Sequence, residues 1–324
     1  AVKGHVSTPL VLEGCYGHCQ LLSPTLPCFC SVIINLIENT PGIQNCGYEH
    51  GLSFYIETKN HKLLLDSGAT DLFLHNAKVL GIDLTRVDTM ILSHGHYDHG
   101  GGLETFLKIN KTAPVYLSRH ALEPHYHGEE KYIGLDVSLA NNKRLIFTDG
   151  TTAIEGGLTL YSCHEKIRKH DLGSFGLQVL ENGEFLPEDF RHEQYLLIEI
   201  PSAESGSDKD QNRTVLFSGC SHKGILDIAD WFRPDVLIGG FHFSKLPLDD
   251  TLKSFAKYLD TFPTEYYTCH CTGQKQFEFM KQYMHGLHYL SCGQSIELFP
   301  SVTLPSEYSP LSATYHPLPH FPEK

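Results

Sequence analysis

The sequence predicts an α/β fold in which β-sheets form a sandwich covered by helices. Many short segments along the 324 residues are rich in apolar and β-branched side chains, which is typical of buried strands. Helical segments fall between these strands rather than after them. Hydrophobic residues make up 41% of the chain, which is enough for a substantial core. The length exceeds that of a usual domain but fits one large single-core enzyme fold.

The predicted strands are short and recur along the whole chain. Residues 31–37 (SVIINLI) form the first, and residues 52–57 and 62–66 follow it, joined by a turn at residues 59–61. Another apolar strand is expected at residues 89–93. The later segments share this pattern and are expected at 115–118, 145–148, 158–162, 195–200, 214–218, 236–238, 266–269 and 295–299.

Helices are expected where apolar residues recur at helical spacing. Residues 71–81 carry Leu72, Phe73, Ala77 and Leu80 at that spacing and end in a glycine, which commonly stops a helix. The other helices are expected at 102–109, 224–231, 251–260 and 274–283.

One domain, residues 30–299, contains all of these elements. Residues 1–29 are expected to form an irregular N-terminal extension, because they contain prolines and little periodicity. Residues 300–324 carry six prolines in 25 residues and are expected to form a Pro-rich tail that wraps the surface or is disordered. Residues 202–213 are small and polar, which indicates a flexible loop between two strands.

Charge and hydropathy exclude several classes of partner. The 25 basic and 38 acidic residues give a net charge of −13, which disfavours nucleic acid and anionic membranes. No apolar run approaches the roughly 18 residues that span a bilayer, and residues 1–30 lack the apolar core of a secretory signal. We therefore expect a cytoplasmic protein with a small-molecule substrate. The ten cysteines are expected to be reduced thiols.

A dense group of metal-ligand side chains lies between a strand and a helix. His94, His96, Asp98 and His99 fall within six residues, directly after the 89–93 strand and before three glycines. A turn at a strand end can direct alternating side chains into one pocket, and glycine permits the tight backbone bend. Imidazole and carboxylate ligands suit zinc, iron or manganese, and two such sets suit a pair of ions. A run of surface histidines is the alternative.

This His-x-His-x-Asp-His pattern resembles the signature of the metallo-β-lactamase-fold superfamily. The Asp66-Ser67-Gly68 segment after an apolar strand is similar to the superfamily's upstream Asp-x-Gly. Residues 49–54, 93–102, 219–222, 240–243 and 269–273 resemble the branch of 7,8-dihydropterin-6-yl-methyl-4-(β-D-ribofuranosyl)aminobenzene 5'-phosphate synthase-like proteins. The resemblance runs from about residue 30 to residue 299. It implies a four-layer αββα sandwich with two divalent metal ions at one edge, between the sheets. Zinc is the leading candidate, and iron and manganese are alternatives.

The resemblance also implies the metal ligands. They are His94 and His96 for the first ion, and Asp98, His99 and His270 for the second. Asp98 is also expected to hydrogen-bond the attacking water. Asp66 is expected to be buried and to orient the ligand loop through hydrogen bonds.

The third ligand of the first ion departs from the common pattern. Many superfamily members place a histidine well before a Gly-Asp pair whose aspartate bridges both ions, whereas this chain has Gly219-Cys220 followed by His222. We choose His222, because it follows an apolar strand as a positioned ligand should. Cys220 is either a ligand or a buried small residue. The alternatives to His222 are three earlier histidines, His164, His170 and His192.

Other residues are candidates for catalysis or substrate binding. His242 could donate a proton to a leaving group, and a hydrogen-bonded loop histidine is the equal alternative. Thr272 and Gly273 precede a helix whose free N–H groups could hold a substrate phosphate, although a threonine N-cap is the simpler explanation. Lys223 could pair with an anion, and a solvated lysine is its alternative. The histidines of residues 123–127 are expected at the surface.

The predicted metals favour hydrolysis. Two ions about 3.5–4 Å apart can share a water, lower its pKa and clamp an attacked phosphoryl or carbonyl group. A dinuclear hydrolase acting through metal-bound hydroxide on a small ester, phosphoester or related substrate is therefore the leading expectation. The net charge of −13 permits a phosphorylated substrate, because the ions dominate the local field. The alternatives are a pterin-related metal-dependent transferase or synthase, and a non-hydrolytic diiron redox or metal-binding protein.

Overall fold

The computed structural model describes residues 31–201 and 212–298. The expected N-terminal extension and Pro-rich tail lie outside these ranges, as does most of the predicted loop at 202–213. Within the described ranges, none of the helices combines the length and the apolar character needed to cross a bilayer.

The first of two seven-stranded sheets contains the N-terminal strands. In order across the sheet, these are β18 (Ser295–Leu298), β1 (Ser31–Ile37), β2 (Ser53–Glu57), β3 (Lys62–Leu65), β4 (Thr89–Ile91), β5 (Val115–Ser118) and β8 (Leu145–Thr148). Strands β18, β1, β2 and β3 pair antiparallel, and β3, β4, β5 and β8 pair parallel. The first and last described strands are therefore neighbours.

The second sheet repeats this mixed pattern. Its strands, in order, are β17 (Leu287–Tyr289), β16 (Glu265–Thr268), β15 (Val236–Gly239), β14 (Arg213–Phe217), β13 (Tyr195–Ile200), β10 (Leu158–Tyr161) and β9 (Thr151–Ile154). Strands β9, β10, β13 and β14 pair antiparallel, and β14 to β17 pair parallel. Each sheet thus has a block of parallel strands whose carboxyl ends meet at one edge.

Apolar side chains from both sheets fill the space between them. Phe54 and Ile56 of β2 point into this central core, whereas Tyr55 between them packs on the outer face. Phe217 of β14 meets Phe54 across the core, with ring centroids 5.8 Å apart. Because both faces of the inner strands are buried, their sequences are almost continuously apolar.

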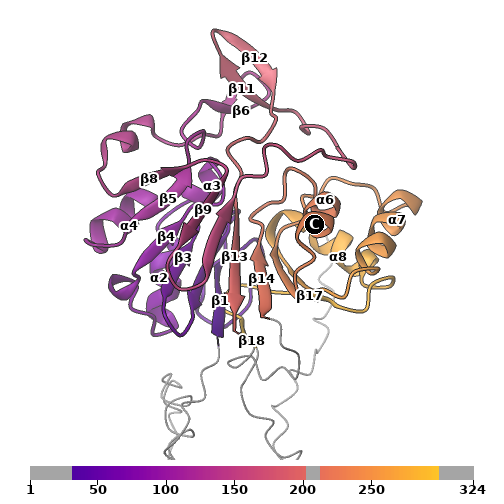
Figure 1. The fold of residues 1–324 in the computed structure, drawn as a ribbon, viewed down its shortest axis with the longest axis horizontal. Coiled ribbons are helices and arrows are strands. Elements are labelled where there is room, and N and C mark those ends of the chain that lie inside the picture. Colours follow the sequence, from indigo (N-terminus) through magenta and orange to yellow (C-terminus); the bar gives the residue numbers. More distant parts are fainter. Residues whose placement is uncertain (1–30, 202–211, 299–324) are drawn as a thin grey trace, which may run out of the picture.

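Helices cover the outer face of each sheet (Figure 1). Helices α2 (Leu72–Val79) and α4 (Leu103–Ile109) pack on the first sheet. Helices α6 (Ile225–Phe232), α7 (Asp250–Leu259) and α8 (Gln274–Met280) pack on the second. The predicted four-layer αββα sandwich is confirmed. The remaining helical segments are short: α3 (Tyr97–Gly100) and the 3-10 turns η2 (Leu84–Arg86), η3 (Val137–Asn141) and η4 (His270–Thr272).

The sequence prediction missed a small sheet at one end of the sandwich (Figure 1). Its strands are β12 (Glu184–Pro187), β11 (Leu177–Glu181), β6 (His125–His127) and β7 (Lys131–Tyr132). They are short and mostly not buried, so their apolar pattern is weak. Asn182 and Gly183, both at positive φ, connect β11 to β12, and this Asn-Gly pair is a strong hairpin signal that could have revealed half of the sheet.

We expect Phe54→Ala to lower the free energy of unfolding by about 3–5 kcal/mol, because it opens a cavity between the sheets. Urea unfolding followed by circular dichroism would measure the change. Ile146 on β8 is a control because it is exposed, and Ile146→Ala should change stability by less than about 0.5 kcal/mol. Equal losses in the two variants would contradict the assignment of this core.

Candidate metal centre

The predicted site residues lie in loops at the carboxyl ends of four strands, and the six predicted ligands come from three of them. The loop after β4 carries residues 94–99, and the loop after β14 carries Cys220 and His222. The loops after β15 and β16 carry His242 and His270. Carboxyl ends of parallel strands meet at the same edge of a sheet, and the two sheets face each other. His94 and His270, which are 176 positions apart in the sequence, thereby lie together at one edge of the sandwich.

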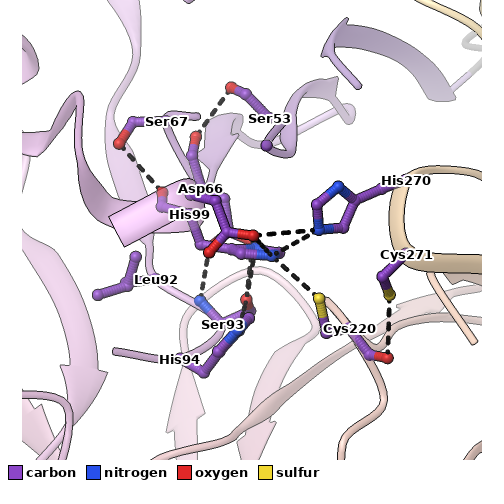
Figure 2. A network of polar contacts seen from close by, with 12 residues as sticks. Ser53, Asp66, Ser67, Leu92, Ser93, His94, His99, Cys220, His270 and Cys271 are labelled. Carbon is purple, nitrogen blue, oxygen red and sulfur yellow. Dashed lines mark hydrogen bonds and ion pairs between the residues drawn. The ribbon is translucent and has the colours of Figure 1, made fainter. Parts of the chain in front are cut away.

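Asp66 fixes the loop that follows β4. Its buried carboxylate accepts hydrogen bonds from the Ser93 backbone N–H, the Ser93 hydroxyl and Nδ1 of His99, each at 2.7 Å (Figure 2). The bond to Nδ1 leaves Nε2 of His99 free to act as a ligand. Helix α3 begins directly after His96 and presents Asp98 and His99 as buried side chains. The predicted orienting contacts of Asp66 are confirmed.

His94, His96 and His222 form a first group of ligand-type nitrogens. One nitrogen of each ring lies within 4.8 Å of the other two, and Nε2 of His94 is 3.3 Å from Nε2 of His222. Two imidazoles bound tetrahedrally to zinc at about 2.0–2.1 Å would have nitrogens about 3.3 Å apart. The Ser93 hydroxyl lies 2.9 Å from Nδ1 of His94, so Nε2 is the nitrogen left for a ligand role.

Asp98, His99 and His270 form a second group beside the first. Nε2 of His270 is 3.3 Å from Nε2 of His99 and 3.4 Å from Oδ2 of Asp98. Oδ1 of Asn39 lies 2.7 Å from Nδ1 of His270 and accepts its N–H, which leaves Nε2 free. The ring centroids of His94, in the first group, and His99, in the second, are 4.0 Å apart, so the two groups are adjacent. All six side chains named as ligands from the sequence lie in one of these two groups.

Cys220 lies between the two groups (Figure 2). Its Sγ is 3.1 Å from Nε2 of His99. Its Sγ lies within 4.8 Å of a ring nitrogen of His94 and of one of His99. It also lies within 4.8 Å of a ring nitrogen of His270. The sulfur is therefore within reach of ligand atoms of both groups.

Burial controls the charge of these side chains. Burial and the neighbouring histidines hold the pKa values of His94, His96 and His222 well below the ordinary value, so their rings are neutral. Burial alone would raise the pKa of Asp98, but the neighbouring histidines His270, His50 and His99 outweigh it and hold that pKa well below its ordinary value. Neutral imidazoles beside a buried carboxylate are the donor set of a divalent cation. The residues therefore fit a metal ion.

His50 and His242 are the more accessible histidines of the centre. The side chain of His50 is 60% exposed, and its Nε2 lies 3.3 Å from Oδ2 of Asp98. The hydrogen bond to Asp98 raises the pKa of His50. His242 is half-buried, with its ring centroid 4.3 Å from that of His222. The sequence analysis missed His50 as a site residue, although residues 49–54 were among the segments that resembled the superfamily branch.

The three alternative histidines have other partners. His164 bonds to a backbone carbonyl, and His170 bonds to a carboxylate of α6. His192 is buried beside the centre, but its Nδ1 accepts the backbone N–H of Gly95 at 2.9 Å. The geometry therefore favours His222 over these alternatives.

The packing contradicts a substrate role for Lys223. Its buried Nζ donates to the backbone carbonyls of Ser162, at 2.5 Å, and Glu193, at 3.1 Å. Burial lowers the pKa of Lys223 to about 8. The ammonium group is therefore used inside the protein, where it braces the turn that carries His222.

The Thr272 hydroxyl and the backbone N–H groups of Thr272 and Gly273 are all used inside the protein. The two N–H groups donate to the carbonyls of Cys269, at 3.1 Å, and His270, at 3.4 Å. The buried Thr272 hydroxyl accepts the N–H of Phe241 at 2.8 Å and is hydrogen-bonded to Thr268. A Cβ at Gly273 would lie 2.5 Å from Oε1 of Gln276, so this position is tightly packed. These residues tie the loop after β16 to the loop after β15 and leave no free hydroxyl for a substrate.

The expectation that residues 123–127 lie at the surface is wrong for His125. This residue is fully buried, and its Nδ1 is 3.0 Å from Oε1 of Glu188. The alternation of β6 turns His125 inward and leaves His127 exposed. No sequence pattern marks Glu188 as a partner, because 63 positions separate it from His125.

Comparison with known proteins identifies related sequences. Residues 47–261 match the family model of the metallo-beta-lactamase superfamily. The chain is also 27% identical over 274 residues to the 7,8-dihydropterin-6-methyl-4-(beta-D-ribofuranosyl)-aminobenzene-5'-phosphate synthase of Methanocaldococcus jannaschii. That alignment covers 77% of this chain and 90% of the relative.

Solved structures show the same fold. Tm1679, described as a metal-dependent hydrolase of the beta-lactamase superfamily, matches with a TM-score of 0.69 and 29% identity, covering 83% of this chain and 99% of that one. The metallo-beta-lactamase fold protein YhfI from Bacillus subtilis matches with a TM-score of 0.51 and 15% identity, covering 84% and 100%. The family model spans well over half of the chain and includes five of the six predicted ligands. This chain belongs to the metallo-beta-lactamase superfamily.

Proposed function

We propose that this chain is a dinuclear metal-dependent hydrolase of a small ester, phosphoester or related molecule. The observation that carries the proposal is the convergence of two adjacent groups of buried ligands at one edge of the sandwich. Zinc is the leading metal, with iron and manganese as alternatives. When bound, two ions would supply Lewis acidity and lower the pKa of a water. The proposed ligands are His94, His96 and His222 for one ion, and Asp98, His99 and His270 for the other.

The residues around the ions would position water and substrate. Asp98 would bind an ion and accept a hydrogen bond from the attacking water, while Nε2 of His50, 3.3 Å from Oδ2, holds its carboxylate in place. His242 has an unpartnered buried Nδ1 among the described residues and would donate a proton to the leaving group. The exposed ring of His50 would contact the substrate.

A pterin-related synthase is the second candidate. The similarity to the M. jannaschii synthase extends over 77% of this chain, which supports the same ligand framework. The description of Tm1679 as a metal-dependent hydrolase supports the first candidate. Both functions would use the same ions, so the substrate decides between them. The cytoplasmic location expected from the sequence stays a prediction.

Metal content and hydrolysis test the proposal directly. We expect protein purified without added metal to contain divalent ions by elemental analysis and to hydrolyse a member of a phosphodiester, lactone and thioester panel. A chelator should abolish this activity, and added zinc should restore it. Metal-loaded protein that hydrolyses nothing in the panel but forms the pterin product would favour the synthase. Folded protein that takes up no metal would contradict both candidates.

The third ligand of the first ion can be tested by counting ions. We expect His222→Ala to bind about one equivalent fewer, because it removes a ligand nitrogen. His192→Asn should keep the wild-type number, because asparagine retains an acceptor for the Gly95 N–H. His288→Ala is the surface control, since His288 lies on β17, its side chain is exposed, and its Nε2 pairs with Glu265 at 2.8 Å. The opposite ranking of the first two variants would place the third ligand at His192.

Cobalt substitution tests whether Cys220 binds metal. We propose that its thiolate is an additional ligand, so cobalt-loaded protein should show sulfur-to-cobalt charge-transfer absorption. Cys220→Ser should lose this absorption, and Cys292→Ser should retain it. Cys292 is the matched control because it is also a buried free thiol, and its Sγ donates to the backbone carbonyl of Glu38. Absence of the absorption in the wild type would leave Cys220 as a buried residue without a ligand role.

A further inference from the structure

A second buried cluster lies behind the ligand loop. His125 of β6, Glu188 and His192 meet His96, and one potential ligand atom of each lies within 4.8 Å of the others. All four residues are buried. Nε2 of His96 and Nε2 of His192 lack a hydrogen-bond partner among the described residues. No step of the proposed function uses Glu188, His125 or His192.

Hydrogen bonding at His192 argues against a metal ion in this cluster. Nδ1 of His192 accepts the backbone N–H of Gly95 at 2.9 Å, so this nitrogen carries no proton. An imidazole with an unprotonated Nδ1 is neutral and carries its single proton on Nε2. A protonated nitrogen has no lone pair for a metal. His192 is therefore a ligand neither of this cluster nor of the first ion.

Glu188 lies on the protonated side of the His192 ring. Oε1 of Glu188 is 3.4 Å from Nε2 of His192. The same carboxylate lies 3.0 Å from Nδ1 of His125, whose Nε2 faces the carbonyl of His120 at 3.3 Å. The rings of His125 and His192 stack with centroids 4.0 Å apart. The negative charge of Glu188 beside Nε2 thus favours the tautomer of His192 that has its proton on Nε2 and accepts from Gly95 at Nδ1.

Gly95 lies between two proposed ligands, so its backbone sets the direction of both. A Cβ at Gly95 would be 2.1 Å from the carbonyl oxygen of Ala121, which shows how closely the backbones approach. The N–H of Gly95 is used by His192. The backbone between His94 and His96 is therefore fixed by close packing against Ala121 and by the hydrogen bond that the Gly95 N–H donates to His192.

Glu193 and Gln194, which follow His192 in the sequence, hold neighbouring parts of the centre. The Glu193 carboxylate accepts the backbone N–H groups of His222 at 2.7 Å and Lys223 at 3.0 Å. The backbone N–H of Gln194 donates to the carbonyl of Ser93 at 2.8 Å. Residues 192–194, just before β13, therefore contact both loops that carry the first group of ligands.

We propose that His192 is a positioning residue of the metal centre: oriented by Glu188, it holds the Gly95 N–H and thereby fixes the spacing of His94 and His96. The inference rests on the proposed metal centre and adds a contact that acts through the ligand loop. Residues that orient ligands in this way typically change metal affinity by about 10–100-fold when they are replaced.

Zinc affinity of two His192 variants tests the proposal. His192→Leu removes the acceptor, whereas His192→Asn keeps an oxygen close to the position of Nδ1. We expect His192→Leu to bind zinc about 10–100-fold more weakly, with the same number of ions at saturation, and His192→Asn to bind close to the wild type. Competition with a chromophoric chelator measures affinity, and cobalt spectra report the ligand geometry. His170→Leu is the matched control, because His170 also pairs with a buried carboxylate, that of Asp227, outside the centre.

Several outcomes would overturn the inference. Unchanged affinity in His192→Leu would do so, as would an asparagine variant as weak as the leucine variant or an equal loss in His170→Leu. Loss of one ion at saturation in both His192 variants would make His192 a ligand. If circular dichroism shows that His192→Leu does not fold, Glu188→Gln decides: weaker zinc binding supports the proposal, and unchanged binding overturns it. A wild type that binds no zinc would instead contradict the proposed function.

Discussion

The Asp66 carboxylate sits at the end of β3 in a space closed to solvent and accepts three hydrogen bonds from Ser93 and His99. A buried carboxylate without such partners would carry a large desolvation cost, so the loop after β4 must present these donors. These hydrogen bonds fix the start of the loop at Ser93 and the orientation of the His99 ring. Because Nδ1 of His99 bonds to Asp66, Nε2 is the nitrogen that faces the centre. Asp66 itself adopts a left-handed backbone conformation, with φ of 58°, to reach this position.

The same sandwich that buries Asp66 also sets the electrostatics of the centre. Two sheets packed face to face exclude water from the edge where their parallel strands end, so His94, His96 and His222 stay neutral and keep lone pairs for a ligand role. Asp98 stays ionised because histidines contact it. Neutral nitrogen donors and one charged oxygen donor are thereby held in a buried site, and the exposed ring of His50 lies beside it.

Support for the ligand loops comes from segments that are remote in sequence. Asn39 orients His270 although 231 sequence positions separate them. Glu193 holds the backbone of His222, which is 29 positions further along the chain. The small sheet contributes His125, which meets Glu188 beneath the loop. A rigid ligand geometry therefore depends on contacts made by several elements rather than on the ligand motif alone.

The sequence by itself determined the sandwich and the ligand motif. Buried strands such as β1 and β13 are mostly apolar, and residues 94–99 place four ligand side chains within six positions, so both signals are local. The tertiary structure alone decided which distant side chains complete the centre and which candidates are used elsewhere. Lys223 and Thr272 are polar residues next to ligands in sequence, yet their polar groups bond to Ser162 and Phe241, which come from other strands and loops. His125 is buried because its own weakly patterned strand, β6, pairs with β11 and turns this side chain inward. Burial and hydrogen-bond partners are long-range properties, and they decide whether a polar side chain serves chemistry or structure.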